Sequence, residues 1–553
     1  MRASGILLPV SSLPSAYGIG CFSKEAYNFV DRLKKAGQAY WQILPLGPTS
    51  YGDSPYQSFS TFAGNPYFID PEDLIERGYI TKKKCDSYDF GDNAEYVDYA
   101  KIYESRFLLL REAWKNSKIS KDPAFRIFVK DNAHWLDDYA LYMAVKASFG
   151  NVCWVEWDEE IKTRKPKALA AYRKKFAGEI EFYQFQQYMF RVQWEKLKNY
   201  ANAKGVKIIG DIPIYVAFDS SDAWANPELF QFDKDCNPTA VAGCPPDAFS
   251  ATGQLWGNPL YAWDHHKKTG YEWWMKRLEA CFKMYDVVRI DHFRAFDAYY
   301  SIPADRETAE IGTWEPGPGY ELFETMKKRL GEREVIAEDL GFLTPSVLEL
   351  VKRTGYPGMK VLQFAFDSRE DSDYLPHNYG QNCVAYTGTH DNDTTMGWYA
   401  QLAEKDKEFC NRYLNLGKCD SEEEIKWEFI RAALSCVANL AVIPMQDYLG
   451  LGPEARINTP STLGDNWKWR MKKGAFTKEL AEEIRAMSEL YGRTSRKVKK
   501  ASKAKGAKAK GTKSAKAEKK ANVRAVQAEK KDKPEKGKKA GSTKKAKQKK
   551  EKA

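Results

Sequence analysis

The sequence contains no pair of cysteines at the C-x-x-C spacing that zinc sites and thiol oxidoreductases use. Its 10 cysteines are scattered along 553 residues, so we expect reduced thiols, no disulfide framework, no metal and no cofactor. Long apolar runs are missing as well: residues 6–10 are too few for a signal-peptide core, and no window approaches the roughly 18 apolar residues of a membrane span. We therefore expect a soluble cytoplasmic protein without a membrane partner.

A uniform basic charge is also lacking, although the formal net charge is +11. Of the 86 Lys and Arg and 75 Asp and Glu, residues 495–553 hold 25 and 5, a net charge of +20. Subtraction leaves 61 basic and 70 acidic residues in the body, a net charge of −9. The basic segment has no aromatic and hardly any large apolar residue, so we expect residues 494–553 to form a disordered Lys/Ala-rich tail.

Eight short apolar runs recur along the body. They occupy residues 5–10, 39–46, 206–216, 286–293, 334–340, 359–366, 383–389 and 440–448. Runs that are apolar on both faces and rich in Val and Ile are typical of a parallel sheet covered by helices. Residues 23–37 and 344–355 begin with Ser or Thr and end on Gly, as helices do. The pattern predicts an α/β fold, most simply a (β/α)8 TIM barrel, with a doubly wound open sheet as the alternative.

Two connections are too long to be simple crossovers. Residues 49–202 are rich in Tyr, Trp and helix signals, and residues 220–270 are rich in Gly and Pro. We interpret both as large inserted subdomains that build walls over the C-terminal face of the barrel. A helix at residues 478–491 would close the globular part, so the predicted catalytic barrel domain covers residues 1–493.

Polar and acidic side chains gather where the predicted strands end. They include Asp211, Asp291, Glu338, Gln363, Asp367, His390, Asp391 and Asp447. For any single acidic residue in such a place, helix N-capping is the simpler explanation. Six strand ends that share the pattern instead predict an active site at the mouth of the barrel.

Several carboxyls in one mouth suit glycosidic chemistry, because crowding and burial force their pKa values apart. A retaining mechanism needs a nucleophilic carboxylate and an acid/base carboxyl about 5 Å apart. Arg289 lies on the same strand face as Asp291 and favours its ionised form, so Asp291 is the candidate nucleophile. Glu338, flanked by apolar residues, is the candidate acid/base, and Asp391 would bind sugar hydroxyls and stabilise positive charge at the anomeric carbon.

Two aromatic residues in loop-like sequence are candidates for stacking on sugar rings. Tyr56 lies in DSPYQS (residues 53–58) and Trp256 in GQLWGNP (residues 253–259), which have little core character. Pyranose rings present apolar C–H faces that an aromatic ring covers well. For the other aromatic residues near the strand ends, packing in the core is the simpler explanation.

Seven segments together resemble the amylomaltases, the 4-α-glucanotransferases of glycoside hydrolase family 77 that are also called disproportionating enzymes. They are DSPYQS (53–58), GDIP (210–213), PPDAFSATGQLWGNPLY (245–261), VRIDHFR (288–294), IAEDLG (336–341), GTHDNDT (388–394) and NTPSTLGDNWKWR (458–470). VRIDHFR alone would indicate only the wider α-amylase group, whereas the long segment at 245–261 is far more specific. The likeness runs from residue 5 to about residue 470, and the basic tail lies outside it.

The resemblance implies a (β/α)8 barrel with inserted subdomains and no C-terminal β-domain. It implies that Asp291 is the nucleophile, Glu338 the acid/base and Asp391 the transition-state stabiliser. The substrate-binding positions that it implies are Tyr56, Asp211, Gln254, Trp256, Arg289, Asp367, His390 and Asn458. The expected partners are maltooligosaccharides and α-1,4-glucans, from which a segment is transferred to the 4-hydroxyl of an acceptor glucan or glucose by a retaining double displacement.

Three other functions remain open from the residues themselves. An α-glucan hydrolase of the α-amylase type needs the same carboxyls and differs only in what attacks the intermediate, and residues 245–261 are the candidate loop that keeps water out. A glycan-binding scaffold without activity would have no need for the intact carboxyl triad. The basic tail would add either weak, nonspecific polyanion binding or a genuine docking role, although it lacks aromatic residues for stacking on bases.

Overall fold

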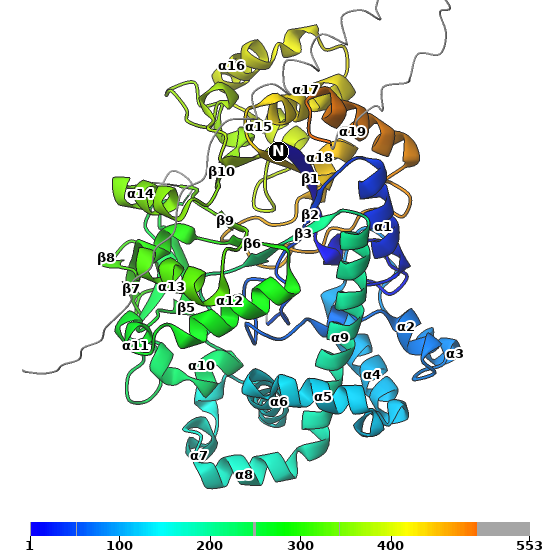
Figure 1. The fold of residues 1–553 in the computed structure, drawn as a ribbon, viewed down its shortest axis with the longest axis vertical. Helices are drawn as coiled ribbons and strands as arrows, with labels where there is room; N and C mark the ends of the chain where they lie inside the picture. Colours follow the sequence, from blue (N-terminus) through cyan, green and yellow to red (C-terminus); the bar gives the residue numbers. More distant parts are fainter. Residues whose placement is uncertain (1, 51, 247–249, 342, 495–553) are drawn as a thin grey trace, which may run out of the picture. The chain divides into compact units, whose positions relative to one another are not determined.

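The computed structural model describes residues 2–50, 52–246, 250–341 and 343–494 (Figure 1). The predictions of a disordered and polyanion-binding tail therefore fall outside the described residues. Eight parallel strands form one sheet in the order β10-β11-β12-β1-β2-β3-β6-β9. These strands are β1 (Ala3–Leu7), β2 (Tyr40–Gln42), β3 (Lys207–Ile212), β6 (Val287–Ile290), β9 (Val335–Ala337), β10 (Gly358–Val361), β11 (Cys383–Tyr386) and β12 (Leu440–Pro444). Each of the eight predicted runs overlaps one of them, and β1 and β10 begin two residues and one residue before their runs.

The two edge strands β9 and β10 meet and close the sheet. Ala337 N donates to Pro357 O at 3.0 Å, and Met359 N donates to Asp339 Oδ1 at 2.7 Å. Because the edges are joined in this way, the predicted (β/α)8 barrel is confirmed and the open doubly wound alternative is wrong.

Helices surround the barrel between successive strands. They are α1 (Lys24–Lys35), α9 (Ala177–Ala203), α12 (Glu272–Met284), α13 (Tyr320–Leu330), α14 (Pro345–Thr354), α17 (Glu422–Ser435) and α19 (Lys478–Leu490). The helices predicted at 23–37, 344–355 and 478–491 are α1, α14 and α19. Helix α14 begins after Thr344, whose side chain accepts from Val347 N, and ends at Gly355 with φ 74°, a conformation that glycine adopts without strain.

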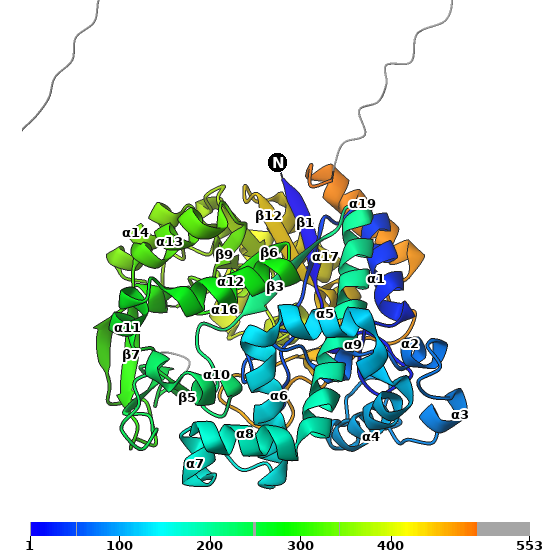
Figure 2. The same ribbon diagram turned by 60° about the horizontal axis from the view of Figure 1, so that its bottom comes forward.

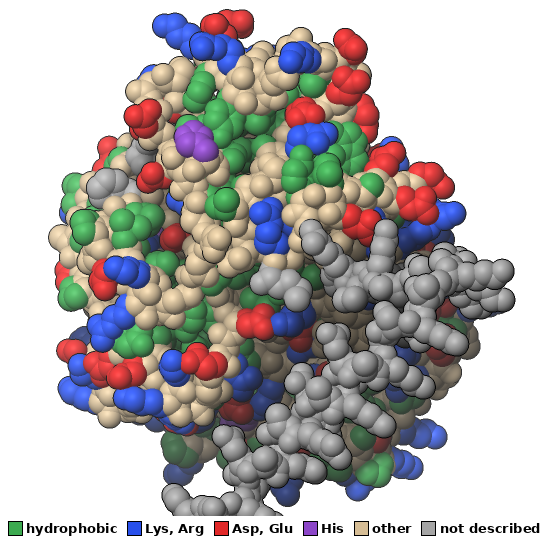
Figure 3. Space-filling view, turned by 45° about the horizontal axis from the view of Figure 1, so that its top comes forward, with side chains coloured by type: hydrophobic (Ala, Val, Ile, Leu, Met, Phe, Trp, Pro, Cys, Tyr) green, Lys and Arg blue, Asp and Glu red, His purple; other side chains and the backbone are tan. Residues whose placement is uncertain are grey.

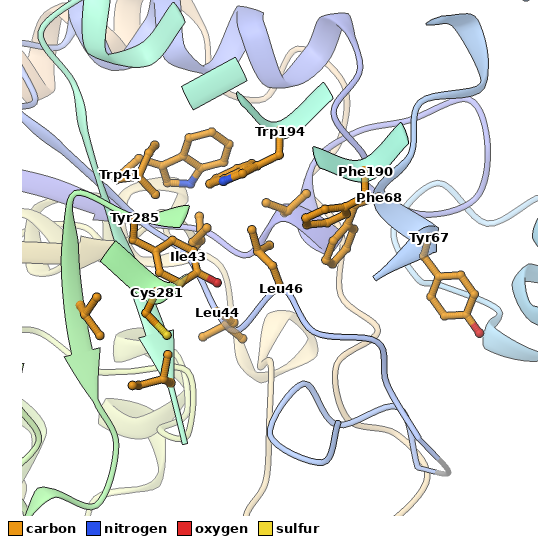
Figure 4. Packing of buried hydrophobic residues seen from close by; sticks show 14 of the residues in the cluster. Trp41, Ile43, Leu44, Leu46, Tyr67, Phe68, Phe190, Trp194, Cys281 and Tyr285 are labelled. Carbon is orange, nitrogen blue, oxygen red and sulfur yellow. The ribbon is translucent and has the colours of Figure 1, made fainter. Parts of the chain in front are cut away.

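Large aromatic residues fill the space between the strands and helices α1 and α9. Trp41 of β2 packs on Phe29 of α1, with ring centroids 5.1 Å apart. Figure 4 shows Trp41, Trp194 and Tyr285 gathered around Ile43. Both indoles are fully buried and satisfy their N–H groups on backbone carbonyls, as buried Trp requires. The core therefore fixes the strands that carry the residues of the barrel mouth.

Gly210 shows how closely this core approaches the mouth. A Cβ atom at Gly210 would lie 2.1 Å from the ring of Tyr285, which leaves no room for any side chain. Strand β3 therefore passes directly under that ring, and the next residue, Asp211, is placed at the strand end with its side chain fully buried.

A helical subdomain follows β2. Its helices are α2 (Pro71–Glu76), α3 (Lys82–Cys85), α4 (Tyr99–Ser117), α5 (Pro123–Asp131), α6 (Ala133–Ser148), α7 (Glu159–Lys162) and α8 (Pro166–Lys175). The long helix α9 contacts α4, α5 and α6 along one part and α1 and β3 along another, so a single helix joins the subdomain to the barrel (Figures 1 and 2).

A second, antiparallel sheet stands beside the barrel in the order β5-β4-β7-β8. Its strands are β4 (Ala240–Cys244), β5 (Gln254–Pro259), β7 (Ala298–Pro303) and β8 (Thr313–Pro316). The first two belong to the predicted insertion at 220–270, whereas the other two follow β6. The sequence analysis did not predict this sheet, because it pairs short strands from two separate connections.

The remaining helices are short or peripheral. They are α10 (Ser221–Ala225), α11 (Trp263–Lys268), α15 (Thr395–Gln401), α16 (Glu404–Leu414) and α18 (Met445–Leu449). Within the described part of the chain, no helix has the length and apolar character needed to cross a membrane. Figure 3 shows acidic and basic side chains interspersed over one face of the body.

Candidate active site

A buried ion-pair cluster lies at the ends of β3 and β6. Arg289 Nη1 donates to both carboxyl oxygens of Asp211, at 2.8 and 2.7 Å, and to Asp291 Oδ1 at 3.0 Å. The side chains of Asp211 and Arg289 are 0% and 3% exposed, whereas that of Asp291 is 29% exposed. Asp291 is therefore the carboxyl of the cluster that a substrate can reach.

The pKa of Asp291 is raised to about 6. Burial is the largest cause, and the positive charge of Arg289 opposes it. The sequence analysis had the direction of the Arg289 effect right but did not anticipate that burial outweighs it. The carboxyl is still ionised in the upper part of the neutral range, as a nucleophile requires.

Glu338 lies beside Asp291 at the end of the neighbouring strand. Ile290 and Ala337 are partners in the β6–β9 register, so the residues that follow them come next to each other at the barrel mouth. Glu338 Oε2 accepts from His292 N at 2.7 Å, and Oε1 accepts from Leu340 N at 2.9 Å. The carboxyl is thus held by two backbone N–H groups.

The pKa of Glu338 is raised to about 7. Burial is again the largest cause, followed by the negative charge of Asp291, and together they outweigh Arg289 and the two N–H donors. A carboxyl with this pKa is protonated at the pH where Asp291 is already largely ionised. The two side chains therefore differ in the way that an acid and a nucleophile must.

Asp391 is the third carboxyl at the mouth, and its pKa is lowered, whereas those of Asp291 and Glu338 are raised. Its Oδ1 accepts from Asn458 Nδ2 at 2.7 Å, and its Oδ2 lies 3.2 Å from His390 Nε2. Burial raises its pKa, but His390 and the Asn458 hydrogen bond outweigh burial and hold the pKa at about 2. Asp391 is therefore a fixed negative charge.

Tyr56 connects two sides of this site. Its hydroxyl donates to Asp211 Oδ2 at 2.8 Å and lies 2.8 Å from His390 Nε2. Its ring stacks on His390 with centroids 5.3 Å apart and an interplanar angle of 12°. Tyr56 therefore ties the end of β3 to the segment after β11, and a pocket lined in part by Tyr56, Asp211 and Tyr215 opens beside it.

Trp256 and Gln254 lie on β5, and Trp256 contacts His292, the residue that follows Asp291. Trp256 Nε1 donates to Gln254 Oε1 at 3.1 Å. The indole meets the ring of His292 edge-on, with centroids 4.7 Å apart and an interplanar angle of 88°. Because His292 directly follows Asp291, strand β5 is in contact with the segment that carries Asp291.

Asp367 lies apart from the other predicted residues. Its carboxyl accepts from Arg369 Nε at 2.8 Å and from Arg369 Nη2 at 2.6 Å. Among the hydrogen bonds and ion pairs of the described residues, none joins Asp367 to the cluster around Asp291. A substrate contact at Asp367 stays a prediction.

Some acidic residues at the strand ends serve the fold, although neither Asp447 nor Asp339 is a helix N-cap. Asp447 accepts from Thr395 N at 2.8 Å and from the hydroxyls of Thr387 and Thr395. Asp339 accepts from Met359 N. The acidic residues at the strand ends therefore include both the carboxyls of the site and residues that hold the loops in place.

Three residues of the site were not singled out from the sequence. They are His292, which supports Glu338; Arg456, whose Nη2 donates to Asp391 O at 2.9 Å; and Trp467, whose ring lies 5.9 Å from that of Tyr56. Two of the three lie in the matching segments, and Arg456 lies two residues before Asn458. Their contributions run through backbone groups or ring packing, which residue type alone does not reveal.

No group of three or more His, Cys, Asp or Glu side chains in the described ranges is arranged to hold a metal ion. The chemistry that the site offers comes from its own carboxyls: one ionised and accessible, one protonated near neutral pH, and one permanently charged.

Comparison with known proteins identifies a family. A family model described as 4-alpha-glucanotransferase matches residues 8–477. The chain is 51% identical over 485 residues to a 4-alpha-glucanotransferase of Clostridium butyricum, covering 88% of this chain and 99% of the relative. It is 48% identical over 496 residues to the 4-alpha-glucanotransferase of Thermus thermophilus, covering 88% and 98%. The amylomaltase of Streptococcus agalactiae, solved in complex with acarbose, superimposes with a TM-score of 0.86 at 43% identity, covering 89% of this chain and 100% of that chain.

Proposed function

The chain belongs to the 4-alpha-glucanotransferases, and on this premise we propose that Asp291, Glu338 and Asp391 carry out the transfer by a retaining double displacement. The observation that carries the proposal is the separation of three carboxyl environments at one barrel mouth: Asp291 is the accessible carboxyl paired with Arg289, the pKa of the adjacent Glu338 is raised by burial and by the charge of Asp291, and the pKa of Asp391 is held low by His390 and Asn458. Such a separation assigns a nucleophile, an acid/base and a fixed charge to different side chains.

In the first step, the Asp291 carboxylate attacks the anomeric carbon of a bound α-1,4-glucan. The glycosidic bond breaks while Glu338 gives its proton to the leaving oxygen, so the donor's reducing-end segment departs as a shorter sugar. The transition state carries positive charge at the anomeric carbon, and the Asp391 carboxylate stabilises it. The product of this step is a covalent glycosyl ester on Asp291.

In the second step, the ionised Glu338 removes the proton from the 4-hydroxyl of an acceptor glucan or glucose. That oxygen attacks the anomeric carbon, the ester bond to Asp291 breaks, and a new α-1,4 bond forms. Two inversions at the same carbon restore the original configuration. Arg289 remains paired with Asp211 throughout and so keeps a positive charge beside the ester oxygen.

Members of this family act on α-1,4-glucans, and we propose maltooligosaccharides as the donors and acceptors of this chain. Acarbose, an oligosaccharide analogue, is bound in the related Streptococcus agalactiae structure. Tyr56, Gln254, Trp256, His390 and Asn458 would contact the sugar, because all five lie around the three carboxyls. We expect the ring of Trp256, which is half-buried and meets His292 edge-on, to cover a pyranose face.

Transfer requires that an acceptor hydroxyl outcompete water at the ester. We assign that task to residues 245–261, of which the described part includes strand β5 beside His292. An α-glucan hydrolase would share every earlier step and differ only here. The segment would exclude water and present the acceptor, as covering loops do in other transferases.

The products formed from maltotriose test this proposal. The wild-type protein should give glucose together with a ladder of longer maltooligosaccharides, whereas Asp291→Asn, Glu338→Gln and Asp391→Asn should lose turnover by at least about a thousandfold. Exclusive release of glucose and maltose without longer products would identify a hydrolase instead. Turnover that survives in Asp291→Asn would contradict the assignment of the nucleophile.

A further inference from the structure

His292 combines two unusual features next to the nucleophile. Its backbone is left-handed, with φ 50° and ψ 49°, a conformation that few residues other than glycine adopt. It stands between the end of β6 at Ile290 and the short helical turn Phe293–Phe296. A single left-handed residue at this point redirects the chain, so the next backbone groups face the neighbouring strand end.

The redirected backbone makes a small donor site for Glu338. His292 N donates to Glu338 Oε2 at 2.7 Å, and the next N–H, that of Phe293, donates to Glu338 O at 3.0 Å. The N–H of His292 therefore binds the carboxyl of Glu338, and the N–H of Phe293 fixes the backbone of the same residue. With Leu340 N on Oε1 at 2.9 Å, both carboxyl oxygens have a fixed donor.

The ring of His292 has a separate partner. It contacts the indole of Trp256 edge-on at 4.7 Å, and its Nε2 is buried without a hydrogen-bond partner among the described atoms. Burial lowers the pKa of the ring to about 3, so the ring is neutral and adds no charge beside Glu338. The ring therefore acts by contact and the peptide acts by hydrogen bonding.

We propose that His292 is a positioning residue for the acid/base carboxyl: its left-handed peptide aims an N–H at Glu338 Oε2, while its ring separately supports Trp256 on β5. The inference rests on the proposed role of Glu338 and extends it to a residue that touches no reacting atom. It predicts that the peptide of His292 governs the acid/base function of Glu338, whereas the ring governs acceptor binding through Trp256.

Substitutions of His292 can distinguish the effect of its backbone conformation from the effect of its ring. Asparagine and glycine adopt left-handed backbone readily, whereas a β-branched residue does so only with strain. His292→Asn and His292→Gly therefore keep the donor N–H but remove the ring. His292→Val opposes the backbone conformation as well, so that the bond to Glu338 Oε2 is lengthened or lost.

The pH profile of kcat/KM for transfer between maltotriose molecules is the decisive measurement. Loss of a donor to the ionised carboxyl raises its pKa, so His292→Val should move the basic limb up by about one pH unit and lower kcat at least about tenfold. His292→Gly and His292→Asn should leave the basic limb in place and instead raise KM for the acceptor, because only the contact with Trp256 is gone. A role confined to folding would lower activity without moving the basic limb.

Two outcomes would overturn the proposal. In the first, all three variants share the wild-type basic limb. In the second, His292→Gly shifts the limb as far as His292→Val, which would assign the effect to the ring. Should His292→Val not fold, as judged by thermal unfolding, His292→Ala carries the same backbone test with a smaller strain.

Glu338→Gln, measured alongside, keeps this proposal separate from the proposed function. Transfer that persists in Glu338→Gln would remove the acid/base assignment itself. An inactive Glu338→Gln together with an unshifted His292→Val would leave that assignment standing and reject only the positioning role.

Discussion

Gln57 and Asn258 face each other through their side-chain amides. Gln57 Nε2 donates to Asn258 Oδ1 at 3.1 Å, and Asn258 Nδ2 donates to Val216 O at 2.7 Å and lies 3.4 Å from Gln57 Oε1. Gln57 follows Tyr56, and Asn258 lies two residues after Trp256 on β5. The pair thus fixes the distance between the two aromatic residues that we expect to hold the sugar.

Replacing Gln57 should therefore change which acceptor reacts. Gln57→Ala leaves Asn258 Oδ1 without its donor, at a cost of about 1 kcal/mol, and loosens β5 relative to Tyr56. We expect the ratio of transfer to hydrolysis on maltotriose to fall roughly fivefold, measured as longer maltooligosaccharides against glucose. Gln57→Glu is the matched control for shape: it keeps the size of the side chain but replaces the donating amide by a carboxylate that faces Asn258 Oδ1, so it should lower the ratio as well. An unchanged ratio in Gln57→Ala would show that the amide pair does not hold the acceptor side.

The pH dependence of the reaction should be a narrow bell. Asp291 must be ionised and Glu338 protonated in the free enzyme, and their pKa values are raised to about 6 and about 7. The value of kcat/KM should therefore rise as the pH passes about 6 and fall as it passes about 7. The two limbs describe the pair rather than either carboxyl alone, because the groups interact. A plateau that extends above pH 8 would contradict the acid role of Glu338.

The barrel was predictable because its eight strands are buried on both faces and read as apolar runs. The runs at 286–293 and 334–340 enclose β6 and β9, although these strands are only four and three residues long. The antiparallel sheet was not predictable in the same way. Strand β8 is exposed at all four positions and carries no apolar signal. Strand β4 is apolar but short, and it pairs with β7 across more than 50 residues of chain, so its pairing is not evident from the local sequence.

The site was predictable to the extent that residue type determines chemistry. The family pattern and the strand ends pointed to Asp291, Glu338 and Asp391, which the structure brings together. Residue type could not reveal the left-handed backbone of His292 or the contact of Arg456 with Asp391 O, because both depend on where the main chain turns. The sign of the pKa shift of Asp291 was equally out of reach, since the extent of its burial follows from tertiary packing.

Asn458 should contribute to activity by stabilising the negative charge of Asp391. It donates to Asp391 Oδ1 at 2.7 Å, a hydrogen bond to an ionised group worth roughly 1.5–3 kcal/mol. Asn458→Ala should therefore lower kcat/KM about 10- to 100-fold while the fold is retained. Asn458→Asp is the informative companion, because it keeps the shape but places a second carboxyl against Asp391. Its activity should fall further and partly recover at low pH, and equal activity of the two variants would reject the electrostatic explanation.

The buried Glu338 carboxyl should lower the free energy of unfolding at alkaline pH, and replacing it by glutamine should remove this effect. Its pKa rises from 4.5 to about 7 on folding, so the folded state binds the proton more tightly than the unfolded state. The stabilising contribution of that proton is complete below about pH 4.5 and is lost as the pH rises through 7. Glu338→Gln resembles the protonated form at every pH and does not titrate.

The free energy of unfolding of Glu338→Gln should therefore match that of the wild type near pH 4.5 and exceed it by about 3 kcal/mol at pH 8. Urea unfolding of the two proteins at both pH values measures the difference. Glu104→Gln, on the exposed face of α4, is the matched control and should change the free energy by less than about 0.5 kcal/mol at either pH. If Glu338→Gln is inactive yet more stable than the wild type at pH 8, the buried Glu338 carboxyl serves the reaction and lowers the free energy of unfolding. Equal stability at pH 8 would instead mean that water reaches Glu338, and the basic limb of the activity profile should then lie well below pH 7.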